Sequence, residues 1–100
     1  MYEIEKLWLL HRNSKFPEDA YREIKGIDLV SLDTFTAGCV DTFLEDKGQL
    51  SLQNTSVLEL SYRELGNVIP EITQPEAHEY FARLEKLAKQ VLDSLRDANR

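Results

Sequence analysis

Few residues of this chain are of the types that carry chemistry. They are two histidines, His11 and His78, one cysteine, Cys39, and scattered carboxylates. Neither histidine lies in an HExxH motif, and no CxxC pair or other metal-ligand spacing is present. A zinc site made of His11, Cys39 and His78 would require three distant segments to converge. No nucleotide-binding loop, nucleophile elbow or EF-hand loop appears either. We therefore expect no catalytic residue, no cofactor and no metal site.

Cys39 lies within TFTAGCVDTF, residues 34–43. A reactive thiol needs a nearby cation, histidine or helix N-terminus to lower its pKa, together with access to solvent. The neighbours of Cys39 are uncharged or acidic, and helical spacing places it between Phe35 and Phe43 on an apolar face. Free cysteine is among the most often buried residue types. We predict a structural core thiol that reacts slowly with thiol reagents until the protein unfolds.

Asp33 is the carboxylate that most needs a partner. It lies at the edge of the same apolar face, beside Leu29 and Val40, where an unpaired charge is costly. Arg63, Tyr62 and His11 are the candidate partners, and water is the other alternative. A pair formed by His11 and Asp33 would be the best starting point for acid–base catalysis. A small-ligand-binding protein or enzyme with an inter-helix site near His11, Asp33 and Tyr62 is therefore the alternative function.

Three long helices are expected to position these residues. The clearest covers about 74–97, where Thr73-Gln74-Pro75-Glu76 forms a capping pattern and nine apolar residues follow in one stripe. A second covers about 28–47, capped by Asp28 and ended by Lys47-Gly48. A third covers about 55–69, beginning near Ser56-x-x-Glu59 or at another of the candidate caps Ser51, Asn54 and Thr55, and ending before Pro70. The inward face of the second helix is predicted to hold Leu29, Leu32, Phe35, Thr36, Cys39, Val40, Phe43 and Leu44.

The first 27 residues are less regular. Residues 2–12 form either a helix, with Ile4, Leu7, Trp8 and His11 on one face, or a strand. Pro17 and the acids after it predict a short helix that ends at Gly26, with Ala20, Tyr21 and Ile24 facing inward. No hairpin dipeptide flanked by alternating apolar residues is found. The predicted fold is all-α: a compact antiparallel helical bundle of three long helices plus one or two short N-terminal helices, resembling a four-helix bundle.

Length and composition describe one domain, residues 1–100. The chain is 42% hydrophobic and 30% charged, typical of a globular protein. Apolar runs such as LWLL are too short to cross a bilayer, and the acids of MYEIEK do not suit a signal peptide. A single cysteine cannot form an internal disulfide, which fits a reducing compartment. We expect a cytoplasmic protein.

The charge is distributed unevenly along the chain. Residues 28–72 hold eight acids and two bases, and this surplus equals the whole net charge of −6. Such a balance repels nucleic-acid phosphates and anionic lipid, so neither nucleic acid nor a membrane is an expected partner. Acids on the second and third helices are candidates for a docking strip on a basic protein partner, or for an ordinary solvated face. The residues expected to bind such a partner are Asp41, Glu45, Glu59 and Glu64.

The leading function is therefore non-enzymatic: a small acidic helical protein that acts through protein–protein interaction, of a regulatory, adaptor or immunity- or antitoxin-like kind. A third alternative is a homodimer, with Gly38 or the exposed pair Leu9 and Leu10 at its interface. Gly38 lies opposite the apolar stripe of its helix, where glycine costs about 1 kcal/mol relative to alanine. It either permits the close approach of a second backbone or is simply tolerated on the surface.

Overall fold

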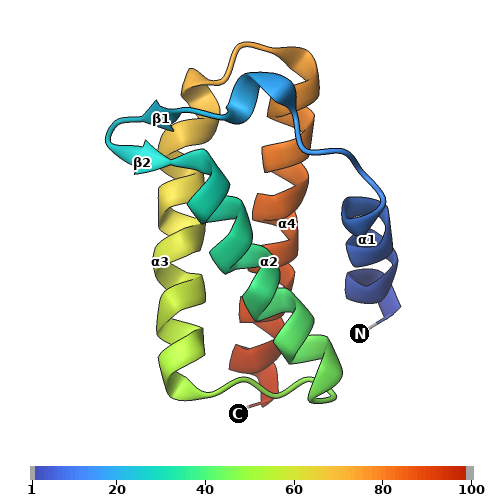
Figure 1. Ribbon diagram of the computed structural model, residues 1–100. Coiled ribbons are helices and arrows are strands. Elements are labelled where there is room, and N and C mark those ends of the chain that lie inside the picture. The colour runs from blue at the N-terminus through green and yellow to red at the C-terminus, as the bar shows by residue number, and fades with distance from the viewer. Residues whose placement is uncertain (1, 99–100) are drawn as a thin grey trace.

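Four α-helices build most of the computed structural model, which describes residues 2–98 (Figure 1). They are α1 (Tyr2–Arg12), α2 (Leu29–Glu45), α3 (Leu52–Val68) and α4 (Pro75–Ala98). Two short 3₁₀ turns, η1 (Glu18–Ala20) and η2 (Ile69–Glu71), lie between them. The radius of gyration of 13.0 Å is that of a compact domain of this length. The predictions of a helical and compact fold are confirmed, and residues 2–12 are helix and not strand.

A small pair of strands corrects the all-α prediction. Strands β1 (Glu23–Ile24) and β2 (Ile27–Asp28) pair antiparallel, and the Leu29 amide donates to the Arg22 carbonyl at 3.1 Å to extend the pairing. The two turn residues, Lys25 and Gly26, both have positive φ, which is the geometry of a type I′ hairpin. The predicted short helix is therefore only a 3₁₀ turn followed by a hairpin. Two-residue strands are too short to show any alternation in the sequence.

The ends of the long helices follow local rules. Ser51 caps α3, accepting a hydrogen bond from the Asn54 amide at 3.1 Å, so this helix begins before Ser56. At the C-terminal end of α2, Lys47 and Gly48 have positive φ, and the Gly48 amide donates to the Phe43 carbonyl. Asp28 stands at the N-terminus of α2 but bonds the Ser31 hydroxyl at 2.7 Å instead of a backbone amide.

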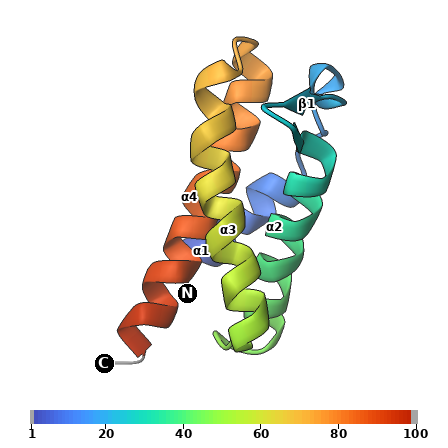
Figure 2. The ribbon, with the colours of Figure 1, turned by 90° about the vertical axis from the view of Figure 1, so that its left-hand side faces the viewer.

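The helices pack in a simple order. α2, α3 and α4 contact one another, successive members run in opposite directions, and α1 packs mainly on α4 at the side away from α3 (Figures 1 and 2). The core has two parts. One, at the hairpin end, includes Leu29, Leu32, Leu65, Val68, Phe81 and Leu84. The other, at the end that holds the α2–α3 loop, includes Ile4, Cys39, Val40, Phe43, Leu58, Leu87 and Val91.

Two aromatic side chains predicted to face inward are exposed. Tyr21 leans edge-on against Phe16, with ring centroids 5.0 Å apart, and is otherwise in solvent because the hairpin turns the chain outward. Phe35 is 59% exposed, although it lies on the second helix as predicted. The buried face of α2 is narrower than the apolar stripe, since α3 and α4 cover only one side of it.

Candidate functional site

A polar cluster joins three helices at the side of the bundle where α1 lies. His11 comes from α1, Asp33 from α2 and Tyr80 from α4. His11 Nε2 is 3.2 Å from Asp33 Oδ1, and the Tyr80 hydroxyl is 3.1 Å from both carboxylate oxygens. One carboxylate thus accepts hydrogen bonds from two side chains that lie 22 residues before it and 47 residues after it in the sequence.

The cluster is shielded from solvent. His11 is 4% exposed and the side chain of Asp33 18%. The second ring nitrogen of His11, Nδ1, is buried and has no hydrogen-bond partner among residues 2–98. The tautomer with its proton on Nε2 donates to Asp33 and leaves only a lone pair unsatisfied at Nδ1. Burial, followed by the charge and hydrogen bond of Asp33, raises the pKa of the Tyr80 phenol well above its usual range.

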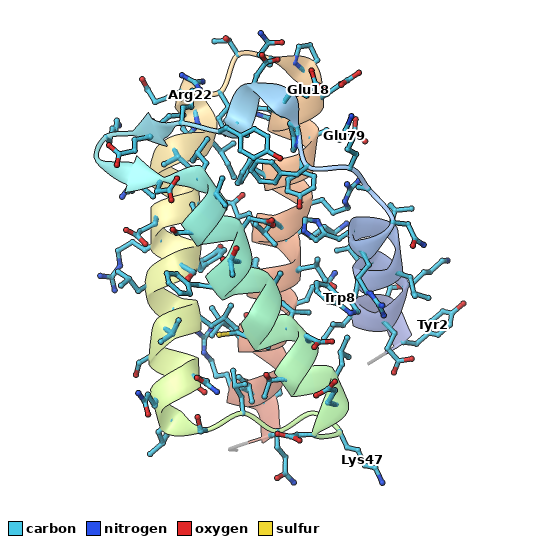
Figure 3. The ribbon with its side chains drawn as sticks, in the orientation of Figure 1. Tyr2, Trp8, Glu18, Arg22, Lys47 and Glu79 are labelled. Carbon is cyan, nitrogen blue, oxygen red and sulfur yellow. The ribbon has the colours of Figure 1, made fainter. Side chains whose placement is uncertain are left out.

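Aromatic and cationic groups close the cluster. The ring centroids of His11 and Tyr80 lie 4.4 Å apart, and Trp8 stacks with His11 at a centroid distance of 6.0 Å. Arg83 lies over the Tyr80 ring at 6.0 Å and donates from Nη2 to the Ser14 hydroxyl at 2.7 Å. These contacts tie α1 and the segment after it to α2 and α4. Figure 3 shows the opposite side of α1, where Tyr2 points away from the bundle.

A histidine oriented by a carboxylate is a common general base, but it needs a ring nitrogen that faces substrate. Here Nε2 faces Asp33, and Nδ1 is buried. His11 and Asp33 line none of the main surface hollows of residues 2–98, although Tyr80 lines one together with Ser14 and Arg83. The arrangement is suited to holding helices together.

The predicted site near His11, Asp33 and Tyr62 is found only in part. The structure brings His11 and Asp33 together, but Tyr62 lies in a separate hollow between α3 and α4 with Arg63 and Lys89. Tyr80 takes its place and was not among the predicted partners, although it lies on the apolar stripe of the 74–97 helix. A buried tyrosine hydroxyl normally has a hydrogen-bond partner, so its position on the apolar stripe was the available signal.

The four acids expected to bind a partner do not share one face. Glu59 lines the hollow between α3 and α4, together with Lys89 and Arg96. Glu64, five residues later, points about 140° away around α3 on an ideal helix. On α2, Glu45 lies two turns after Gly38, only about 20° around the helix from it, and Asp41 lies about 60° from Gly38.

Cys39 and Gly38 are neighbours with different surroundings. The prediction of a buried thiol is confirmed: Cys39 Sγ is 3.5 Å from the Asn54 carbonyl oxygen, and burial raises the pKa of the thiol. Slow labelling remains a prediction. A Cβ atom built on Gly38 would have no atom of residues 2–98 within 4 Å, apart from its own helix backbone and chain neighbours. No second backbone of the described chain approaches this glycine.

A hollow of about 330 Å³ lies on the outer side of α2 and α3. Phe35, Gly38 and Thr42 line it from α2, Asn54 and Val57 line it from α3, and Cys39 lies at its floor. Leu60, which follows Val57 on α3, is also exposed. This hollow, whose lining is both apolar and polar, was not predicted, because Phe35 was assigned to the core.

The remaining candidates lie apart. His78 is exposed on α4 and lies far along the chain from the buried His11 and Cys39. Within residues 2–98, no group of three or more His, Cys, Asp and Glu side chains is arranged to hold a metal ion. No helix in the same range has both the length and the apolar character needed to span a membrane.

Comparison with protein-family models, curated proteins and solved structures finds no significant match to this chain.

Proposed function

We propose that this chain is a non-enzymatic interaction protein, of a regulatory, adaptor or immunity- or antitoxin-like kind, that binds a protein partner with a basic surface. The observation that carries the proposal is the confinement of the acid surplus to residues 28–72, the segment that contains α2 and α3. Charge of one sign on one part of a surface speeds and orients docking onto a partner of opposite charge.

The packing of the helices supports the same proposal. Asp33 is occupied inside the protein by His11 and Tyr80, but Glu45 and Glu59 are exposed and Asp41 and Glu64 are half-buried. The proposed scaffold is an antiparallel bundle resembling a four-helix bundle. Its single free cysteine suits a reducing compartment, so we propose a cytoplasmic site of action.

The test is affinity capture with the immobilised chain, followed by elution in rising salt. We expect a captured protein with a basic surface, released at moderate ionic strength because screening weakens contacts between exposed charges. Neutralising the middle segment should abolish most of the capture: Asp41→Asn, Glu45→Gln, Glu59→Gln and Glu64→Gln. The matched control removes the same amount of charge from exposed acids elsewhere and should retain binding: Glu3→Gln, Glu5→Gln, Glu23→Gln and Glu76→Gln.

Two results would reject the proposal. One is capture that does not depend on salt. The other is equal loss in the two charge variants, because net charge alone would then explain binding.

The second candidate, a small-ligand-binding protein or enzyme, rests on the 3.2 Å contact between His11 and Asp33. It requires ligand to reach a ring nitrogen when the side chains around His11 move. A thermal-shift screen of small metabolites tests this. A hit that is lost in Asp33→Asn but retained in Asp41→Asn would favour this candidate over the interaction protein.

A further inference from the structure

We infer that the outer hollow between α2 and α3 is a docking groove for a basic amphipathic helix of the partner. This inference rests on the proposed function and names the part of the surface and the shape of partner that the proposal leaves open. It follows from three features of the groove: its floor, its ends and the absence of an occupant from the described chain.

The floor of the groove is apolar at its centre. Phe35 is 59% exposed beside the bare backbone of Gly38, and Val57 faces them from α3. A glycine between larger side chains leaves a depression into which a side chain of a third helix fits. Helices pack by setting the side-chain ridges of one helix into the grooves of another. A helix of the partner can therefore pack along the groove between the antiparallel helices α2 and α3.

The two ends of the groove are acidic. Glu45 lies two turns after Gly38 along α2, and Glu64 two turns after Val57 along α3, each about 20° around its helix from that residue. Figure 1 shows that α2 and α3 run in opposite directions. The two acids, each two turns further along its own helix, therefore stand at opposite ends of the groove. Cys39 lies level with Asn54, Glu45 lies six residues further along α2, and Glu64 lies ten residues further along α3 in the opposite direction. The two acids are therefore separated by roughly 24 Å along the groove, the length of a helix of about 16 residues.

No described element crosses this side of the protein. α1 lies on the far side of α2, and the hairpin lies beyond the N-terminal end of α2 (Figures 1 and 2). A second copy of this chain suits the groove less well, since residues 28–72 would bring acid against acid. An apolar centre flanked by carboxylates matches a helix with an apolar centre and Lys or Arg near both ends.

The test uses a synthetic 16-residue helical peptide with a two-turn leucine face at its centre and two lysines at each end. Binding to the full chain is measured by fluorescence anisotropy at low salt, and the site is mapped by ¹⁵N–¹H NMR. We expect shifts at Phe35, Gly38, Thr42 and Val57. A peptide of the same composition, with its lysines moved to the centre, should bind about tenfold more weakly.

Variants of the floor test shape. Phe35→Ser should weaken binding about tenfold, and Leu10→Ser is its control, because Leu10 is 58% exposed on α1, away from the groove. Gly38→Leu should weaken binding by a similar factor by filling the depression. An added side chain meets nothing within 4 Å at its Cβ, so the fold should be retained, which circular dichroism and thermal unfolding check.

Variants of the ends test charge. Glu45→Gln and Glu64→Gln should each weaken binding about threefold and reduce its salt dependence. Glu3→Gln should leave peptide binding unchanged, because Glu3 is exposed on α1, on the side of the bundle away from the groove.

The possible outcomes separate the inference from the proposed function. Equal effects of Glu3→Gln, Glu45→Gln and Glu64→Gln with no effect of Phe35→Ser would overturn the groove and leave a diffuse electrostatic partner surface. A dimer in light scattering that Phe35→Ser dissociates would assign the groove to a second copy and also overturn the inference. Absence of peptide binding overturns the groove alone, since capture of a basic protein tests the proposed function separately.

Discussion

The two flanks of α2 differ in what covers them. On one flank Asp33, a charged residue, is enclosed by hydrogen bonds from His11 and Tyr80. On the other flank Phe35, only two residues later, is 59% exposed beside Gly38. On this helix the charged side chain of Asp33 is shielded from solvent, whereas the aromatic side chain of Phe35 is exposed. Packing partners from the other helices, more than residue type, therefore decide which side of α2 is interior.

The largest expected effect separates two phenylalanines of the same helix. Phe43→Ala should destabilise the protein by about 3–5 kcal/mol, because its fully buried ring leaves a cavity. Phe35→Ala should cost less than about 1 kcal/mol, because most of that ring is already in solvent. Urea unfolding followed by circular dichroism measures both. Equal losses of unfolding free energy in the two variants would mean that Phe35 is buried and that the side of α2 holding Phe35 and Gly38 is covered.

The next largest effect on stability is expected on the side of α2 where Asp33 is hydrogen-bonded to His11 and Tyr80. Asp33→Ala should cost about 2–4 kcal/mol, because it leaves His11 Nε2 and the Tyr80 hydroxyl buried without an acceptor. Asp41→Ala, on the same helix, should change the free energy of unfolding by less than about 0.5 kcal/mol. Chemical denaturation of the two variants gives the comparison. A small loss in Asp33→Ala would show that the cluster is accessible to water.

Removing one hydroxyl should have a moderate and pH-dependent effect. Tyr80→Phe should cost about 1–2 kcal/mol near neutral pH, because the hydrogen bonds to Asp33 are lost. The fold raises the pKa of Tyr80, so the folded state keeps its proton while the unfolded chain releases it near pH 10. The stability that Tyr80 contributes is therefore complete below pH 10 and declines as the pH rises above it.

The measurement is the difference in unfolding free energy between wild type and Tyr80→Phe at pH 7 and above pH 10. The difference should shrink at high pH, and other titrating groups cancel because both proteins contain them. A difference that grows with pH would contradict the environment assigned to Tyr80.

The smallest expected effect is a gain in stability on the exposed side of α2, at Gly38. Gly38→Ala should stabilise the protein by up to about 1 kcal/mol, because alanine favours helix and its Cβ meets no atom within 4 Å. Gly26→Ala should destabilise it by a similar amount, roughly 1 kcal/mol, because Gly26 has a φ of +77°. Thermal unfolding compares them. Destabilisation by Gly38→Ala would reveal a backbone close to that face.

Much of the fold could be predicted because helical periodicity and capping are local. The inward stripe of α4, the stop at Gly48 and the burial of Cys39 all depend on residues within one or two turns. The hairpin could not be predicted in this way, because strands of two residues have no period. Its only signal was the pair Lys25-Gly26, which is weaker than the Asn-Gly or Asp-Gly pairs of such turns.

The candidate sites could be predicted only in part, because they are formed by contacts between residues far apart in the sequence. His11 was one of several partners considered for Asp33, and Tyr80 was not among them, because a pattern that repeats every few residues carries no information on which helices meet. The four acids were grouped by sequence, but Glu59 faces α4 while Glu45 lies on α2 below Gly38. The orientation of each helix about its own axis places these acids on different faces of the bundle.

Composition and spacing within a helix are sufficient to predict the three long helices, the acid surplus of residues 28–72 and the inward position of Cys39. The packing of the helices, which the sequence pattern does not reveal, places α1 against the Asp33 side of α2 and leaves Phe35 and Gly38 open. The physical reason is that a helix touches its neighbours over part of its circumference. Which part that is depends on side chains from α1, α3 and α4, distant in the chain, that together close the core.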